Sequence, residues 1–296
     1  MKATIKLKIS QELIDLVKLI ATDLSQNIGA DQPGFYIQHY LYFQPHLETI
    51  FSVGEFFGFK ATHRILEIGS GLGIKCLLGK AIWGADFTGL EPCADSFSLL
   101  QNAIFEFKKT NPSFSYTLIN KPGEDTGLPA ESFDFAVSFE VLEHVHDPKS
   151  VIHEIHRVLK PGGKFFFSTC NYRSFYEGHY RCPWFPFFNR YLASFWVRSL
   201  GYNVKFLDEI NFITRSQLLS YLRKCGFKRT LLGFTYPNPG PPKLSVESPN
   251  GFDPVQRNTR SFFWGRAIQH PLIQSILRPI GMEYKIWGMV EKPYTS

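Results

Sequence analysis

The feature that most constrains the fold is a glycine-rich turn between an apolar segment and an amphipathic one. Residues 64–75 read Arg-Ile-Leu-Glu-Ile-Gly-Ser-Gly-Leu-Gly-Ile-Lys. Gly69, Gly71 and Gly73 allow a tight turn, and because they lack a Cβ atom a ligand can approach the backbone. A helix opening near Gly73 would add unpaired N–H groups and a partial positive charge. The pattern predicts a strand, a turn and a helix with a ligand site at their junction.

Two carboxylates beside the turn indicate the kind of ligand. Glu91 lies 18 residues beyond Gly73, at the end of the next expected strand, where an acidic side chain can bind both hydroxyls of an adenosine ribose. Glu67 lies inside the strand before the turn, where a carboxylate suits a cationic ligand and would repel a pyrophosphate. The spacing is also Gly-x-Gly-x-Gly rather than Gly-x-Gly-x-x-Gly. An NAD-dependent dehydrogenase is therefore the least favoured function, and an ordinary tight turn is the alternative for the loop taken alone.

From residue 61 onward, short apolar runs alternate with amphipathic stretches, the pattern of β-α-β units and a parallel sheet. We expect strands at residues 64–68, 87–90, 115–119, 133–139, 164–169, 227–235 and 284–290. We expect helices at residues 73–80, 95–109 and 148–159. Residues 1–60 predict a helical extension, residues 237–251 predict a loop, and residues 61–296 form the main domain. The expected fold class is α/β.

Four segments, in this order and spacing, resemble the motifs of class I S-adenosylmethionine-dependent methyltransferases, in particular the small-molecule type of ubiquinone biosynthesis. The segments are residues 64–73, 123–134, 139–145 and 157–163. The resemblance implies a Rossmann-like, doubly wound sheet of seven strands with the last antiparallel. It also implies S-adenosylmethionine as methyl donor and a small organic acceptor, with oxygen as the expected acceptor atom.

Carried over position by position, the resemblance implies a cofactor site. The three glycines would hold the methionine and ribose parts, Glu67 would orient the loop or the amino group, and Glu91 would bind the ribose. Glu124 stands where the family usually has Asp for the adenine amine, with Asp125 beside it, and either can make that contact. Glu140 ends the fourth strand and would face the methyl group. The implied cofactor-binding residues are Glu67, Gly69, Gly71, Gly73, Glu91, Glu124, Asp125 and Glu140.

Candidate catalytic residues follow the fourth and fifth strands, because ligands collect at the carboxyl ends of parallel strands. Glu140, His144 and His179 are the candidates, since methyl transfer to oxygen needs an aligned acceptor and help in removing its proton. Glu140, Glu143 and His144 also have the Glu-x-x-Glu-His spacing, which resembles the metal-binding element of both ubiquinone-biosynthesis O-methyltransferases and RNA 3′-terminal ribose methyltransferases. A divalent metal, with His179 as a fourth ligand, is an option. It is not favoured, because many small-molecule members carry similar residues without a metal.

Two segments are expected to cover the acceptor site. Residues 172–202 hold a high density of aromatic side chains and follow the fifth strand, where the family inserts substrate covers. They predict a lid over an apolar or aromatic acceptor, a core between the sheet and the extension, or a surface in contact with lipid. Residues 236–283 are the second expected cover.

Charge and composition limit the partners. The formal net charge is +6, but the basic residues form only pairs, which argues against nucleic acid as a partner. No apolar run reaches the roughly 20 residues of a membrane helix. The N-terminus lacks a signal-peptide core, and the five cysteines form no CxxC pair. These features favour a cytoplasmic protein, with peripheral lipid contact left open and no indication of oligomeric state. A metal-dependent RNA ribose methyltransferase and a catalytically silent cofactor-binding protein are the alternative functions.

Overall fold

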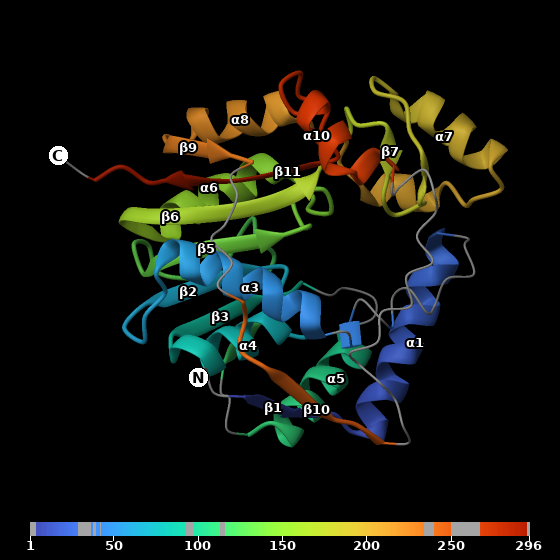
Figure 1. Cartoon of the computed structure of the whole chain (residues 1–296). Helices are drawn as coiled ribbons and strands as arrows, with labels where there is room; N and C mark the ends of the chain where they lie inside the picture. The colour runs from blue at the N-terminus through green and yellow to red at the C-terminus, as the bar shows by residue number, and fades with distance from the viewer. Residues whose placement is uncertain are drawn as a thin grey trace.

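A seven-stranded mixed sheet forms the centre of the computed structural model, which describes residues 4–28, 37, 40–41, 43–92, 97–112, 116–233, 240–249 and 267–294 (Figure 1). The strands are β2 (Arg64–Ile68), β3 (Asp86–Leu90), β4 (Thr117–Ile119), β5 (Phe133–Phe139), β6 (Leu159–Cys170), β9 (Lys228–Leu232) and β11 (Lys285–Glu291). Their order is β4-β3-β2-β5-β6-β11-β9. The pairs from β4 to β6 are parallel, whereas β11 is antiparallel to both of its neighbours. The predicted α/β fold with an antiparallel last strand is confirmed.

Both faces of the sheet are buried, which explains the nearly continuous apolar runs in β5 and β6. The core on one face contains side chains of α1 (Gln11–Ile28), α3 (Phe43–Phe57), α4 (Ile74–Trp83) and α5 (Phe97–Thr110). The core on the other face contains side chains of α6 (Pro148–Val158) and α8 (Arg215–Lys224). Successive strand residues alternate between the two, since Phe166 belongs to the first core and Phe165 and Phe167 belong to the second.

Local hydrogen bonds fix where the helices on the second face begin. The Asp147 carboxylate accepts from the N–H groups of Lys149 and Ser150, and Pro148 occupies the first turn of α6. Thr214 begins α8 with a reciprocal capping box. The loop between β5 and α6 contains Glu140, Glu143 and His144. Because α6 starts at a fixed point, this loop is anchored at both ends.

The N-terminal extension is not wholly helical, which corrects the expectation for residues 1–60. Ile5–Lys8 forms a strand, β1, that pairs in parallel with β10 (Leu244–Glu247), inside the segment predicted as a loop. In β1 buried and exposed residues alternate, with Ile5 and Leu7 buried. This period of two favours a strand over a helix. Its partner comes from near the other end of the chain, so no local pattern could reveal the pairing.

The aromatic insert at residues 172–202 builds a small core of its own beyond the ends of β5 and β6 (Figure 1). It contains the short hairpin of β7 (Tyr176–Glu177) and β8 (Cys182–Pro183), followed by α7 (Arg190–Ser199), and the 3-10 helix η1 (Lys205–Glu209) comes next. Trp184 is 2% exposed and stands edge-on to Tyr172 and Phe212, at ring-centroid distances of 5.9 and 5.5 Å. Trp184 is therefore a core residue of the insert.

Only part of the second expected cover, residues 236–283, falls within the described residues. Residues 236–239 and 250–266 lie outside them. The described part contains β10 and α10 (Pro271–Leu277). Across the described ranges, no helix combines the length and the apolar character needed to cross a membrane.

We expect Trp184→Ala to lower the free energy of unfolding by about 3–5 kcal/mol, because it removes a buried ring and leaves a cavity. Phe195→Ala is the matched control, since Phe195 on α7 is 71% exposed and surface changes stay within about 0.5 kcal/mol. Urea denaturation of both variants measures the difference. Equal losses for the two substitutions would contradict the core position of Trp184.

Candidate active site

The glycine turn is closed by packing on two sides and open on the third. Left-handed backbone occurs at all three predicted positions, with φ of +66°, +53° and +72° at Gly69, Gly71 and Gly73. A Cβ atom added to Gly69 would stand 2.3 Å from Val141, and one added to Gly73 would stand 2.3 Å from Tyr116. Among the described residues, a Cβ atom on Gly71 would meet only the Tyr40 ring, at 3.7 Å. A ligand can therefore reach the backbone at Gly71, whereas the other two glycines are required by packing.

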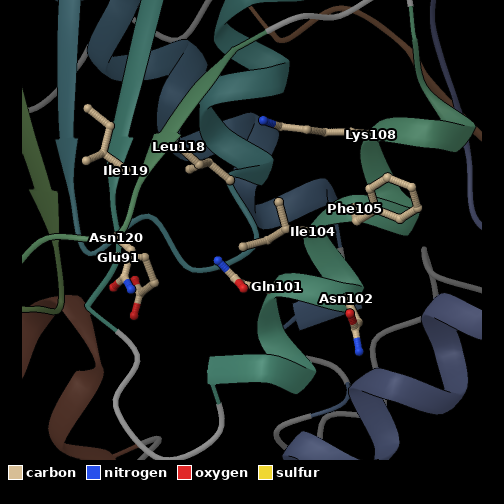
Figure 2. Close-up of a pocket in the computed structure, with 9 residues that line it drawn as sticks. All are labelled: Glu91, Gln101, Asn102, Ile104, Phe105, Lys108, Leu118, Ile119 and Asn120. Atoms are coloured by element: carbon tan, nitrogen blue, oxygen red, sulfur yellow. The ribbon is translucent and has the colours of Figure 1, made fainter.

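Glu91 reaches back from the end of β3 to this turn. Its Oε2 accepts a hydrogen bond from the Gly71 N–H at 2.8 Å. Burial raises the pKa of the Glu91 carboxyl, and the hydrogen bond opposes that shift. Glu91 also lines a cavity of about 430 Å³ beside α5. Figure 2 shows Gln101 of α5 pointing across this cavity toward Glu91 and Asn120.

Glu67 is a buried carboxylate at the base of the turn, with 1% of its surface exposed. Its Oε2 accepts from the Cys76 thiol at 3.1 Å, and its Oε1 lies 3.4 Å from the Lys75 ammonium. Oε1 has no hydrogen-bond partner in the described part of the chain. Burial raises the pKa of Glu67, and Lys75 opposes that shift. An unsatisfied buried carboxylate oxygen suits a ligand that brings a positively charged donor.

The two candidates for the adenine contact lie in different surroundings. One carboxylate oxygen of Glu124 accepts from the Asp147 N–H at 3.1 Å, at the start of α6. Asp125 is exposed. Glu124 therefore has one oxygen committed to the protein, while Asp125 faces solvent.

Glu140 ends β5 in a strained conformation. Its φ is +56°, in the left-handed region that non-glycine residues rarely adopt and that clusters at functional sites. Its carboxylate lies 2.8 Å from the ammonium of Lys285, on β11. Burial is the largest single influence and favours a raised pKa, but the Lys285 charge together with hydrogen bonds from Lys285 and Ser168 holds the pKa of Glu140 below its usual value. Glu140 is thus an ionised, paired carboxylate and a weak base.

Glu143 is fully buried and interacts electrostatically with Glu140. It accepts hydrogen bonds from the Thr169 hydroxyl at 2.7 Å and from the Cys170 N–H at 3.2 Å, both at the end of β6. Burial, followed by the charge of Glu140, raises the pKa of Glu143. The Glu143 side chain therefore links the loop after β5 to the carboxyl end of β6.

His179 stands between a carboxylate and a second imidazole. Its Nδ1 lies 2.7 Å from Glu177 Oε1, and its Nε2 lies 3.0 Å from His144 Nε2. Glu177 is itself held by the Tyr172 hydroxyl and the Tyr180 N–H. Burial lowers the pKa of His179, but the carboxylates, Glu177 foremost, raise it above the usual 6.5. Two facing nitrogens at 3.0 Å can share only one proton, so each imidazole senses the charge of the other.

The side chains that could hold a metal ion together are only partly those predicted. Ligand atoms of Glu143, Cys170 and His179 lie within 4.8 Å of one another. Of the predicted metal set, Glu143 belongs to this group, Glu140 pairs with Lys285, and His144 faces His179. A thiol is a softer ligand than the carboxylates, so this group would suit a transition metal better than Mg²⁺.

Sequence reasoning missed the residues that position these groups. Glu177 precedes His179 by two residues, and that proximity was an available signal. Lys285 and Cys170 carried no such signal, because they reach the site on strands that meet it only in the folded sheet.

Comparison with known proteins gives a family match. A family model described as a methyltransferase domain matches residues 14–232. The ubiquinone biosynthesis O-methyltransferase of Pseudomonas syringae pv. tomato is 37% identical over 111 residues, covering 38% of this chain and 46% of that protein. The protein of the same name from Aromatoleum aromaticum is 31% identical over 182 residues, covering 60% of this chain and 69% of that protein. The chain thus spans between about half and about two thirds of these relatives.

A solved structure matches a larger share of the chain. Phosphoethanolamine N-methyltransferase 2 of Haemonchus contortus, in complex with S-adenosyl-L-methionine, aligns with a TM-score of 0.51 and 14% identity. The match covers 85% of this chain and 53% of that chain. At this identity the likeness shows the fold alone.

We expect Glu177→Gln to lower the pKa of His179, because the substitution removes the nearest negative charge. Histidine NMR titration measures it, and His156 serves as an internal control whose pKa, lowered by burial, should not move. The direction of the His179 pKa shift also determines how the stability of the protein depends on pH. A raised folded pKa stabilises the protein fully below about 6.5, and this contribution is lost as pH rises through the folded pKa. A His179 pKa that does not change would contradict the pairing.

Proposed function

The chain belongs to the class I S-adenosylmethionine-dependent methyltransferases, and from this premise we propose that it methylates a hydroxyl oxygen of a small organic acceptor, with His179 as the base. The observation that carries the proposal is the His179 imidazole, held at Nδ1 by Glu177 with its other nitrogen facing His144 in the loop between β5 and α6. A base fixed by a third group is the arrangement that proton abstraction needs. The names of the two relatives support oxygen as the acceptor atom.

The residues around the turn fit the cofactor. S-adenosylmethionine, when bound, supplies a methyl carbon to the acceptor oxygen, and the carbon–sulfur bond breaks with its electron pair left on sulfur. Gly71 gives access to the backbone, and Glu91 would bind the ribose hydroxyls. Glu67 Oε1, buried without a hydrogen bond in the described residues, would take the positively charged amino group.

The proton of the acceptor would leave through the two histidines. The acceptor hydroxyl would take the place of the His144 nitrogen at His179 Nε2, which accepts the hydroxyl proton, and the Glu177 carboxylate stabilises the imidazolium that forms. His144 contacts the same nitrogen and is exposed, so it can pass the proton to solvent. Glu140 is the poorer base because Lys285 neutralises it. Since His179 must start neutral, turnover should rise as pH increases through its pKa.

The surroundings of the histidines favour an aromatic acceptor. The Phe206 ring lies 5.9 Å from the His144 ring and 5.3 Å from the His179 ring. An aromatic wall beside a base suits a phenolic or similarly apolar alcohol.

A metal-assisted reaction is the second candidate, and the grouping of Glu143, Cys170 and His179 favours it. A cation held there would lower the pKa of an acceptor hydroxyl and make a histidine base unnecessary. Metal analysis and chelation separate the two mechanisms. Loss of turnover on chelation, with cofactor affinity intact, would select the metal.

We expect Gly71→Val to abolish binding of S-adenosylhomocysteine, because the new side chain would occupy the open side of the turn. Gly58→Val is the matched control, since Gly58 has φ +66° and no atom of the described part of the chain lies within 4 Å of an added Cβ. Each variant should lose roughly 1–2 kcal/mol of stability from left-handed strain. Calorimetry measures affinity and thermal denaturation measures stability, with NAD as a ligand that should not bind. Normal binding by folded Gly71→Val would remove the turn from the site.

We expect His179→Gln to reduce turnover by about 10²–10⁴-fold, the usual contribution of a positioned base, with cofactor affinity unchanged. His153→Gln, an exposed position on α6, is the control and should keep full activity. The assay uses labelled methyl donor with a panel of phenols and aliphatic alcohols. If His179→Gln keeps near-normal turnover on an acceptor that the unmodified protein methylates, the base is another group.

A further inference from the structure

The outward face of the insert carries aromatic side chains that a helix normally buries. On α7, Ala193 and Val197 pack into the insert core, whereas Tyr191 and Phe195 are 80% and 71% exposed. The loop before α7 and the same helix face contribute further exposed apolar groups. We name this surface the aromatic patch, and its members are Phe185, Phe187, Tyr191, Leu192 and Phe195. A patch of this kind on a globular protein marks a contact surface.

One residue of the aromatic patch, Phe187, has a strained backbone conformation. Phe187 has φ +77°, a left-handed conformation that is a rare outlier for a bulky side chain. The Arg173 guanidinium carbon lies 4.6 Å from the centre of its exposed ring. Such strain persists only where the surrounding structure imposes it, and it concentrates at functional positions.

The charge around the aromatic patch is positive. Residues 178–207 contain Arg181, Arg190, Arg198 and Lys205 but no Asp or Glu. The next carboxylate along the chain, Asp208, lies 3.9 Å from Arg190 and offsets that charge. Arg198 follows Phe195 by three residues on the exposed side of α7, so a cation and aromatic rings share one surface.

We propose that the aromatic patch docks on the surface of an anionic lipid bilayer. Exposed aromatic rings in a segment, residues 178–207, that contains four cationic side chains and no carboxylate match what the interface between headgroups and acyl chains binds. A second copy of the chain is the poorer partner, because a two-fold contact through this patch would bring like charges together. The patch belongs to the insert that carries His179, beyond the ends of β5 and β6 (Figure 1). Bilayer docking does not depend on the proposed methyl transfer, since it requires neither cofactor nor acceptor.

Vesicle sedimentation tests the proposal on the full chain. Vesicles of phosphatidylcholine alone are compared with vesicles of phosphatidylcholine mixed with phosphatidylglycerol, at low and at high salt. We expect binding to the mixed vesicles that weakens at high salt. Phe187→Ser combined with Phe195→Ser should reduce that binding at least about tenfold by removing two inserting rings. Leu19→Ser, on the exposed side of α1, is the apolar control and should bind normally.

A second pair of variants isolates the charge. Arg198→Gln should weaken binding to the mixed vesicles about fivefold, the effect of one cation near an anionic surface. Arg223→Gln is matched to it, because Arg223 is also exposed in the last turn of a ten-residue helix, and it should have no effect. Circular dichroism checks the fold of each variant, and if the serine variant does not fold, the arginine pair decides.

Three results would overturn the proposal. One is a folded protein that binds neither kind of vesicle. Another is binding that the aromatic and Arg198 substitutions leave unchanged. The third is a concentration-dependent dimer, seen by sedimentation velocity, that the same substitutions dissociate, because the patch would then be an interface between copies.

Discussion

The turn after β2 is the constraint on which the rest of the structure depends. Its first and third glycines leave no room for a Cβ atom, because Val141 and Tyr116 pack against them. Tyr116 precedes β4 and Val141 follows β5, so the turn is wedged between segments from two other strands. Glu91 then ties the end of β3 to the middle glycine. One short segment therefore ties together the carboxyl ends of β2, β3 and β5, while Tyr116 packs on it from the start of β4.

At that edge of the sheet, each acidic side chain is stabilised by a partner that neutralises it or donates hydrogen bonds to it. Glu140 and Glu143 lie close enough for one to raise the pKa of the other, and each is satisfied differently. Lys285 neutralises Glu140, whereas Glu143 stays buried on hydrogen bonds from the end of β6. With these two carboxylates committed, the imidazole of His179 is the group whose proton can move near neutral pH.

The insert shows why aromatic content alone does not reveal a role. Trp184 and Tyr180 form a core, while Tyr191 and Phe195, only a few residues further, face solvent. Composition could not distinguish the buried rings from the exposed ones. For this reason the sequence was compatible with three interpretations of the insert: a lid, a core and a lipid-binding surface. The direction of each ring depends on how α7 lies over the hairpin, and that is a property of the packed insert.

The sequence by itself determined the sheet strands, the glycine turn and the positions of Glu67, Glu91 and Glu140, because strand periodicity and left-handed turns are local properties of the backbone. The contacts that define the candidate chemistry were decided only by the tertiary structure. His179 meets His144 because the insert folds back over the β5–α6 loop, and Lys285 meets Glu140 because β11 enters the sheet beside β6. The pairing of β1 with β10 was likewise decided only by the tertiary structure. In each case the partners are far apart along the chain, and their meeting depends on the path of the whole chain rather than on any local spacing.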